Sequence, residues 1–581
     1  MAARRQKTAL VFGAGIAGLS AAHYLIKYGF KVTVIEALAV PGGMARSERR
    51  AVDRDVPSEY SWRGFGPWYS NVFALMKEIP VVTSDGTLST VYDDRLSGPI
   101  GFHLVEDQEN PSIKDADVGS SFRISNGWRL SPLGFTQVGW LMFRQWTASK
   151  SRSEHTYANQ NASKTLYKYL NPVAAKTASQ VFGPFVGVDH GRASTHHVAD
   201  FFKKNMFPGA KHEHKAKMEK DGTVRAPAWT QRNNSGWVIL NRPSSEAWFS
   251  VWKEYLEGKG VTFRFNTPLD RLESTTNSQV TAAYLGDGER VTADEYVLAI
   301  NPFVTVDVLI KSSKSLQQDY ELKKFIPLTA DGPHVQISFQ LVFGEKITLP
   351  GGNETAVILT DSEFDITLYS QDQLFAKDVD LGNDAVSLWS GTATIDSVQG
   401  SLYGKTMLQL TKEEFIKELE HQIYRCKSLN AMVKLANKGR SLKDFDFVRI
   451  QVWGNWRFIG DDPEITTTTG DLDKWVNTTN TQLHQPATQT SFRNLFLAGA
   501  HCQTSADLWS MEGAVESGKR AAEMIAGCAS TIKLQSEPFH VLKRVDEFLW
   551  KHNLPHILDC LVVCIVIGIL AFCLCRMKTK H

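Results

Sequence analysis

Three glycines near the start of the chain have a spacing that suits phosphate binding. Gly13, Gly15 and Gly18 form the pattern Gly-x-Gly-x-x-Gly, and Glu36 follows Gly18 by 18 residues. In this pattern the first glycine permits a tight turn, the second lets the backbone approach a pyrophosphate, and the third lets a helix pack on a strand. Free N–H groups at the helix start bind the anion, and the acidic residue accepts hydrogen bonds from a ribose. The predicted site comprises Gly13, Ala14, Gly15, Ile16, Ala17, Gly18, Glu36 and Ala37.

The elements that must position these residues are readable from hydrophobic patterning. Thr8–Phe12 is apolar enough for a buried parallel strand, a helix rich in Ala and Leu runs from Ile16 to about Tyr28, and Lys31–Ile35 forms the next strand. A strand, helix and strand of about 30 residues is the context that the glycine pattern requires. The sequence therefore predicts a Rossmann-like dinucleotide-binding unit.

A second glycine segment distinguishes between dinucleotides. The run Pro41-Gly42-Gly43-Met44-Ala45-Arg46-Ser47 resembles the second glycine motif of flavoproteins with the glutathione-reductase-like arrangement. This resemblance implies FAD, with the backbone and Arg46 gripping the diphosphate. An ordinary turn would explain the proline and glycines but not Arg46 and Ser47. No second Gly-x-Gly-x-x-Gly unit follows, so we expect electrons to pass to oxygen, a quinone or another acceptor rather than to an NAD(P)H domain.

The C-terminal third carries a longer resemblance. Asn494-Leu-Phe-Leu-Ala-Gly499-Ala-His501 and Asp507-Leu-Trp-Ser510-Met-Glu512-Gly513-Ala-Val-Glu-Ser517-Gly518-Lys519 resemble the terminal flavin motif of the flavin amine oxidase superfamily. Within it, the strings look most like plant-type phytoene and zeta-carotene desaturases and hydroxysqualene-processing enzymes. With a weaker match around Gly260 and Val261, the resemblance implies that FAD is also bound by Val261, Gly499, Ser510, Met511, Glu512 and Ala514.

Two departures and one aromatic segment bear on catalysis. Ala500 stands where these relatives have Glu, Asp or Ser, and His501 and Cys502 follow it. His501 is a candidate acid or base, with a buried structural histidine as the alternative. Cys502 lies outside the motif of covalently flavinylated amine oxidases, so we expect non-covalent FAD. Trp62 and Arg63 lie in a segment that resembles the one passing the flavin ring, and are the other catalytic candidates.

The remaining pattern predicts an α/β fold with interleaved domains. Strands at 261–265, 295–300 and 494–498 should join the first sheet, strands at 335–343 and 385–390 a second sheet, with helices at 244–257 and 412–426. We expect a discontinuous Rossmann-like, glutathione-reductase-like FAD domain of residues 1–75, 235–300 and 450–530. An α+β substrate domain would comprise residues 76–234 and 301–449.

Composition excludes some partners and gives no sign of a metal site. A formal net charge of +2 with 22% charged residues gives no bulk reason to expect nucleic acid. The basic stretch from Lys203 to Lys220 contains His212 and His214, but no cysteines or carboxylates at ligand spacing. We interpret it as a solvated loop and expect no metal.

The C-terminal residues predict membrane attachment. Sixteen residues, Cys560 to Cys575, carry no charge, and 557–576 is just long enough for a transmembrane helix. Residues 531–556 should form an amphipathic linker, with Phe539, Leu542, Val545 and Leu549 at helical spacing. This predicts a single C-terminal span with a cytosolic flavin domain, in the endoplasmic reticulum rather than the mitochondrial outer membrane.

Three functions remain open from the sequence. The leading hypothesis is an FAD-dependent oxidoreductase that removes hydride from a lipid-like, isoprenoid substrate at a membrane, with oxygen or a quinone as acceptor. The second is a flavin amine oxidase that produces hydrogen peroxide. The third is a membrane-tethered scaffold without redox activity, against which the intact glycines at both ends argue.

Overall fold

The computed structural model describes most of the chain. The described residues are 5–60, 64–105, 116–117, 122–124, 132–180, 183, 187–207, 217–218, 224–225, 237–275, 278–349, 355–359, 362–533 and 539–559. Trp62, Arg63, His212, His214 and residues 560–576 of the expected transmembrane segment lie outside this set.

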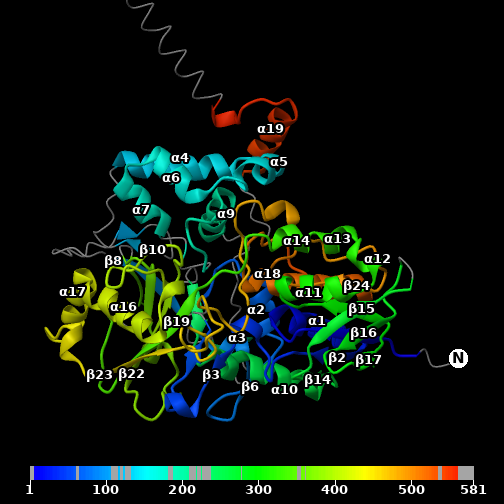
Figure 1. Cartoon of the computed structure of the whole chain (residues 1–581), viewed down its shortest axis with the longest axis horizontal. Helices are drawn as coiled ribbons and strands as arrows, with labels where there is room; N and C mark the ends of the chain where they lie inside the picture. The colour runs from blue at the N-terminus through cyan, green and yellow to red at the C-terminus, as the bar shows by residue number, and fades with distance from the viewer. Residues whose placement is uncertain are drawn as a thin grey trace, which may run out of the picture.

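The first sheet is parallel and draws its five strands from three distant parts of the chain (Figure 1). Its order is β14 (Thr262–Arg264), β2 (Lys31–Ile35), β1 (Thr8–Phe12), β18 (Glu295–Leu298) and β24 (Leu495–Leu497). The predicted strands at the start of the chain, near 261 and 295, and near 494 are thus confirmed as members of one sheet.

Two helices pack together beside this sheet. α1 (Ile16–Lys27) follows β1, and α18 (Met511–Ala526) follows β24. Gly518 brings the helices into close contact, because a Cβ there would lie 2.2 Å from the carbonyl oxygen of Ala17. The helices that carry the N-terminal glycine motif and the C-terminal flavin motif therefore lie side by side.

The second sheet has ten strands and belongs to the other half of the molecule (Figure 1). Its main path runs β23 (Phe447–Val452), β19 (Ile337–Phe343), β22 (Ser387–Ala393), β21 (Ile366–Ser370), β20 (Thr355–Leu359), β8 (Leu96–Val105), β10 (Phe122–Ile124) and β9 (Ala116–Asp117). β13 (Trp237–Leu240) pairs with β8 and with β5 (Gly64–Phe65). One face packs in a common core with α16 (Lys412–Arg425) and α17 (Lys427–Ala436).

Helices cover one end of the second half. They are α4 (Pro132–Trp146), α5 (Lys150–Arg152), a π-helical turn (Ser153–Tyr157), α6 (Ala162–Tyr169), α7 (Pro172–Gln180) and α9 (Thr195–Met206). α19 (His540–Lys551), in red in Figure 1, packs on this group. The predicted linker 531–556 thus contains a helix that docks on the protein.

The other described elements are short or connect these layers. The helices are α2 (Ser70–Met76), α3 (Val91–Asp94), α10 (Ser250–Gly258), α11 (Pro302–Lys311), α12 (Lys314–Gln317), α13 (Tyr320–Lys323), α14 (Phe325–Leu328) and α15 (Gln371–Leu374). A π-helical turn (Ser245–Phe249) precedes α10. The strands are β3 (Ser47–Glu48), β4 (Ser58–Glu59), β6 (Pro80–Val82), β7 (Leu88–Thr90), β11 (Lys217–Met218), β12 (Val224–Arg225), β15 (Leu269–Glu273), β16 (Ala282–Leu285) and β17 (Arg290–Val291).

The domain boundaries differ from the sequence-based ones in two places. Residues 302–328 were expected in the substrate domain, but Leu309, Leu316 and Phe325 share a core with Leu10 and Phe12 of the first sheet. Residues 237–240 were expected in the FAD domain, but β13 pairs within the second sheet. Both segments lie next to a point where the chain passes from one domain to the other. At such points hydrophobic patterning does not indicate which sheet a segment joins.

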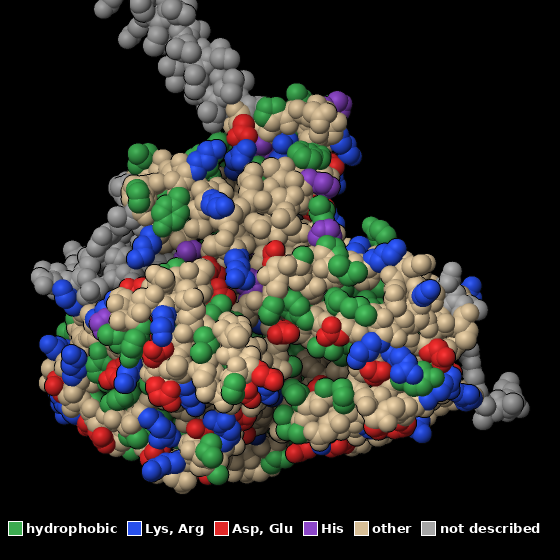
Figure 2. Space-filling view, viewed as in Figure 1, with side chains coloured by type: hydrophobic (Ala, Val, Ile, Leu, Met, Phe, Trp, Pro, Cys, Tyr) green, Lys and Arg blue, Asp and Glu red, His purple; other side chains and the backbone are tan. Residues whose placement is uncertain are grey.

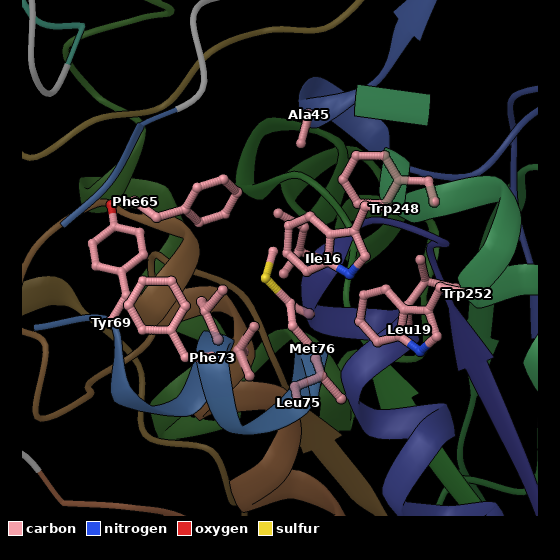
Figure 3. Close-up of a cluster of buried hydrophobic side chains, with 14 of the residues drawn as sticks. Ile16, Leu19, Ala45, Phe65, Tyr69, Phe73, Leu75, Met76, Trp248 and Trp252 are labelled. Carbon is pink, nitrogen blue, oxygen red and sulfur yellow. The ribbon is translucent and has the colours of Figure 1, made fainter. Parts of the chain in front are cut away.

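An aromatic core packs against α1 (Figure 3). The indole rings of Trp248 and Trp252 stack with centroids 5.6 Å apart, and Phe65 contacts Trp248 edge-on at 5.9 Å. All three side chains are fully buried, together with Leu19 of α1. Burying such large rings stabilises the fold by several kcal/mol each on the usual scale of about 25 cal/mol per Å², and this fixes α1 beneath the glycine turn.

No helix within the described residues has the length and apolar character needed to cross a membrane.

Candidate functional site

A cavity of about 340 Å³ runs between the two halves of the molecule. The loops after β1, β2, β18 and β24 line much of it. Ligands of open parallel sheets bind outside the carboxyl ends of the strands, and this cavity has that position. Fourteen predicted cofactor residues line it: Gly13, Gly15, Ile16, Ala17, Glu36, Ala37, Gly42, Gly43, Met44, Ala45, Gly499, Ser510, Met511 and Ala514.

The three glycines of the first motif have different surroundings. A Cβ on Gly13, whose φ is +101°, would lie 2.4 Å from the carbonyl oxygen of Ala299. A Cβ on Gly18 would lie 1.9 Å from the carbonyl oxygen of Gly13, and one on Gly15 would meet no heavy atom within 4 Å. At Gly13 and Gly18 a side chain would clash with the protein's own backbone. At Gly15 the absence of a side chain leaves space in the cavity wall for a ligand.

Glu36 ends β2 and lines the cavity. The backbone N–H groups of Ala14 and Leu38 donate to its two carboxylate oxygens at 2.5 and 2.8 Å. Burial raises the pKa of this carboxyl, although these backbone donors and Arg46 oppose the rise. Ala14 itself does not line the cavity; its N–H fixes the carboxylate that does. The arrangement leaves remaining lone pairs for ribose hydroxyls.

Arg46 makes its described contacts within the protein, and its grip on the diphosphate stays a prediction. Its guanidinium is buried, donates to the carbonyl oxygen of Gly43 at 2.9 Å and forms an ion pair with Asp471. It also lies over the ring of Trp453 at 5.2 Å. Arg46 does not line the cavity. Its contacts stabilise the Gly42–Gly43 turn from the side away from the cavity.

The C-terminal motif supplies a helix start at the cavity. Ser510 caps α18, and its hydroxyl accepts from Gly513 N–H at 3.1 Å. Met511 and Ala514 in the first turn line the cavity. The N-terminal end of a helix favours negative charge. The predicted C-terminal motif therefore begins a 16-residue helix whose positive end lies at the cavity.

Two predicted cofactor residues lie away from the cavity. The carboxylate of Glu512 is fully buried and accepts from the backbone N–H groups of Asn71 and Val72 at 2.9 to 3.0 Å, so it caps α2. Burial raises the pKa of Glu512 to about 7, against these hydrogen bonds. Val261 is 4% exposed and packs in the core of the first half. Both residues support the site through packing rather than lining it.

His501 lines the cavity, whereas Cys502 does not. The imidazole packs against Phe325 and Trp475 at 5.4 and 6.3 Å. Burial lowers the pKa of His501 to about 3, so the ring is neutral near pH 7 and is a poor reservoir of protons there. Cys502 is buried, and burial raises the pKa of its thiol. The other two catalytic candidates, Trp62 and Arg63, lie outside the described residues.

Several residues outside the predicted set also line the cavity. Tyr60, Tyr69, Gly187, Gln336 and Lys474 all contribute to the cavity. Lys474 is buried, and its ammonium donates to the Gln336 side-chain oxygen at 2.5 Å. A Cβ on Gly187 would lie 2.1 Å from this ammonium nitrogen. No sequence pattern pointed to Gln336 or Lys474.

A row of buried polar side chains leads from Gln336 across the second sheet. Its amide donates to the Thr394 hydroxyl at 3.3 Å. Further along the same face, Gln340, Thr367 and Thr392 are at most 2% exposed. The amide atoms of Gln340 and both threonine hydroxyls have no hydrogen-bond partner among the described residues. Buried polar groups are rarely left unpaired, so such a group calls for a physical explanation, such as a water or ligand that the structure does not contain.

Asp365 lies at the end of this row. A Cβ on Gly183 would be 3.0 Å from one Asp365 carboxylate oxygen and 3.7 Å from the Thr394 methyl group. Asp365 is fully buried, and neither carboxylate oxygen has a partner among the described residues. Burial and the charge of Asp189 raise the pKa of Asp365 well above its ordinary value.

The residues present fit FAD. Gly15 leaves open space, Glu36 offers carboxylate oxygens at the end of β2, and α18 directs its N-terminus to the same cavity. These are the donors and acceptors that a pyrophosphate and a ribose need. Within the described residues, no group of three or more His, Cys, Asp or Glu side chains could hold a metal ion.

Comparisons with known proteins agree with this geometry. The model of the NAD(P)-binding Rossmann-like domain matches residues 11–79, and that of the flavin containing amine oxidoreductase family matches residues 460–526. The search of curated proteins found no match. The resemblance to the flavin amine oxidase superfamily is confirmed over residues 460–526, and the Rossmann-like dinucleotide-binding unit over residues 11–79. The narrower likeness to desaturases stays a prediction.

Solved structures share the fold. An oxidoreductase from Methanosarcina mazei has a TM-score of 0.55 at 13% identity, over 89% of this chain and 100% of its own. Cyclohexylamine oxidase from Brevibacterium oxydans IH-35A has a TM-score of 0.54 at 14% identity, over 90% and 99%. A putrescine oxidase bound to putrescine has a TM-score of 0.54 at 13% identity, over 90% and 100%.

Fold and site together define a flavoprotein of the Rossmann-like class. More particularly, the chain is an FAD-dependent oxidoreductase that carries the C-terminal flavin segment of the flavin containing amine oxidoreductases.

Proposed function

We propose that this chain oxidises a polar, basic small molecule, an amine, in preference to the isoprenoid lipid that its sequence first suggested. The observation that carries the proposal is the buried row from Gln336 to Asp365, which contains a carboxyl and hydrogen-bonding groups that have no partner within the described part of the chain. An isoprenoid would leave these groups unpaired at a cost of about 1 to 3 kcal/mol each. Binding of an ammonium group would release the proton that the buried Asp365 carboxyl retains, so that the ammonium pairs with the carboxylate. Polar parts of the substrate would pair with the amide and hydroxyls.

The likeness to cyclohexylamine oxidase and putrescine oxidase supports the same choice. FAD, when bound, supplies the acceptor for an electron pair. In the proposed reaction the C–H bond beside the nitrogen breaks, and its hydrogen leaves as hydride. The nitrogen loses one proton, giving an imine that water hydrolyses to a carbonyl compound and an amine or ammonia. Oxygen takes up the two electrons with two protons and becomes hydrogen peroxide.

This chain's own residues have defined tasks in that reaction. Asp365 binds a charged ammonium group of the substrate, and this ammonium group lies at a distance from the reacting carbon. Gln336 lines the cofactor cavity and donates to the Thr394 hydroxyl, so the polar row begins at that cavity. The neutral ring of His501 and the aromatic rings of Phe325 and Trp475 close the wall and exclude water.

The test is an oxidation assay with the purified, FAD-loaded full chain. Diamines, cycloalkylamines and an isoprenoid alcohol are compared for flavin bleaching without oxygen and for hydrogen peroxide with oxygen. We expect amines to bleach the flavin. Replacement Asp365→Asn should raise the KM for cationic amines about 10-fold or more, the scale of a lost charge-assisted hydrogen bond.

Glu254→Gln, on an exposed side of α10, is the control for the loss of one carboxylate and should leave the KM unchanged. Bleaching by the isoprenoid alone would contradict the proposal and restore the lipid hypothesis. The absence of flavin from the purified chain would favour the redox-inactive scaffold.

Membrane attachment is a separate proposal from the sequence. The cytosolic orientation and the endoplasmic reticulum location also stay predictions, because residues 560–576 lie outside the described residues.

A further inference from the structure

α19 has an outward face whose chemistry is unlike that of an ordinary surface helix. Val541, Val545 and Phe548 are 60%, 40% and 59% exposed, at the spacing i, i+4 and i+7 that places them on one side. Arg544 and Lys551 are also exposed and flank this apolar stripe. Of the four residues predicted at helical spacing, Val545 lies on this outward side.

The inward face of α19 is fixed by a buried ion pair. The fully buried Asp546 accepts from Arg152 at 2.9 and 3.0 Å and from the Ser149 backbone N–H at 2.7 Å. The Arg152 guanidinium also donates to the Leu554 carbonyl oxygen at 2.9 Å. A buried ion pair of this kind holds its elements in one register, since a shifted register would leave a charge unpaired. The helix therefore cannot turn its apolar stripe inward.

The segment after α19 is held at the same end of the molecule. Arg144 of α4 donates to both carboxylate oxygens of Asp559 at 2.9 and 2.6 Å. Phe539, just before α19, stacks on Trp146 with centroids 6.2 Å apart. Figure 2 shows hydrophobic side chains over α19 at the top of the molecule, beside basic and histidine side chains.

The sequence after Asp559 indicates what this face meets. The next sixteen residues carry no charge, and Arg576, Lys578 and Lys580 follow them. Such a run prefers hydrocarbon to water. A helix with an apolar centre and basic flanks, ending a few residues before such a run, has the composition of helices that lie in a bilayer interface.

We propose that the outward face of α19, formed by Val541, Val545 and Phe548 with Arg544 and Lys551, lies on the surface of an anionic lipid bilayer. The apolar side chains enter the boundary between headgroups and acyl chains, and the basic side chains contact anionic headgroups. The Arg152–Asp546 ion pair fixes α19 to the rest of the protein. It then determines the orientation of the flavin-binding part of the chain relative to the membrane. The proposal does not depend on the identity of the substrate.

The test uses the full chain in vesicles of phosphatidylcholine, with or without phosphatidylserine. A photoreactive phenylalanine analogue replaces Phe548, and in a matched control it replaces Leu435, which is 70% exposed on α17. Light-induced adducts are identified by mass spectrometry. We expect lipid adducts at 548 and none at 435.

The basic flank is tested in the same experiment. The double variant R544S/K551S should lower the yield of lipid adducts at 548 about 5-fold per removed charge in phosphatidylserine vesicles, with little change in pure phosphatidylcholine. Both residues are exposed, so the variant should fold and bind FAD like the parent chain. Adducts between two copies of the chain, or no adduct at 548 with vesicle-bound protein, would overturn the proposal, the first by identifying a self-association face.

Discussion

The carbonyl oxygen of Gly13 occupies the space that a side chain on Gly18 would need, with 1.9 Å between that oxygen and the position of a Cβ. Gly15, between them, has no heavy atom within 4 Å of the same position. In this motif the fold itself requires some of the glycines, whereas binding of a ligand requires Gly15. Substitutions can separate these two requirements.

The glycines should respond differently to alanine. Gly18→Ala should destabilise the fold by more than about 3 kcal/mol, because the added carbon meets backbone atoms that cannot move away. Gly15→Ala should leave the unfolding temperature of the FAD-free protein unchanged and weaken FAD binding by about 2 kcal/mol, or roughly 30-fold. FAD content and thermal unfolding of the purified variants measure both effects. Gly139→Ala in α4, with nothing within 4 Å, is the control, and a normal FAD content in Gly15→Ala would argue against a cofactor at this turn.

Glu36 should contribute through its charge. Glu36→Gln keeps the shape but cannot accept from both Ala14 and Leu38 and also offer a carboxylate to a ribose. We expect FAD affinity to fall about 10-fold, the scale of one hydrogen bond to a charged group. Fluorescence titration of the FAD-free protein measures the dissociation constant. Glu254→Gln serves again as the control, and equal affinity in both variants would place the ribose elsewhere.

His501 should not carry the pH dependence of the reaction. Its pKa is lowered by burial from 6.5 to about 3. The unfolded chain takes up this proton below about pH 6.5 and the folded chain does not, so the residue lowers the free energy of unfolding as the pH falls towards 3. His501→Asn should therefore keep the apparent pKa values of kcat/KM near neutrality, with a change in rate below about 10-fold. Loss of one limb of the pH profile, together with a rate loss of about 100-fold, would instead identify it as an acid or base.

The sequence predicted the parts of the site that backbone geometry dictates. Gly13, Gly18 and the Ser510 cap have positions that only certain residue types satisfy, and patterns record such positions. The motif at Glu512 gave no sign that its carboxylate caps α2 across 440 residues of chain. Gln336, Lys474 and Asp365 were missed because their importance arises from where the second sheet meets the cavity. A single strand pattern records that one face is polar, but not what that face meets.

The strongest test of the buried polar row is the effect of Asp365 on stability. Burial raises the pKa of Asp365 well above 3.8, its ordinary value. Above that pH the unfolded chain releases the proton while the folded chain retains it, so the free energy of unfolding falls as the pH rises until the folded-state pKa is passed. Asp365→Asn removes this penalty. The variant without substrate should be more stable than the parent near pH 7, by about 1 to 3 kcal/mol, and no more stable near pH 3.

Asp200 provides a control of opposite sign. It is also buried, but the ammonium groups of Lys203 and Lys204 outweigh the burial and lower its pKa. Asp200→Asn should therefore destabilise the protein near pH 7, and this loss should begin to shrink only below about pH 4, where the unfolded chain takes up the proton. Thermal unfolding of both variants from about pH 3 to about pH 8 compares the two carboxyls. If Asp365→Asn also destabilised the protein near pH 7, Asp365 would be a structural carboxylate with a partner, and the site proposed for the substrate ammonium would be lost. A gain in stability combined with weaker amine oxidation is the trade-off expected of a residue kept for binding.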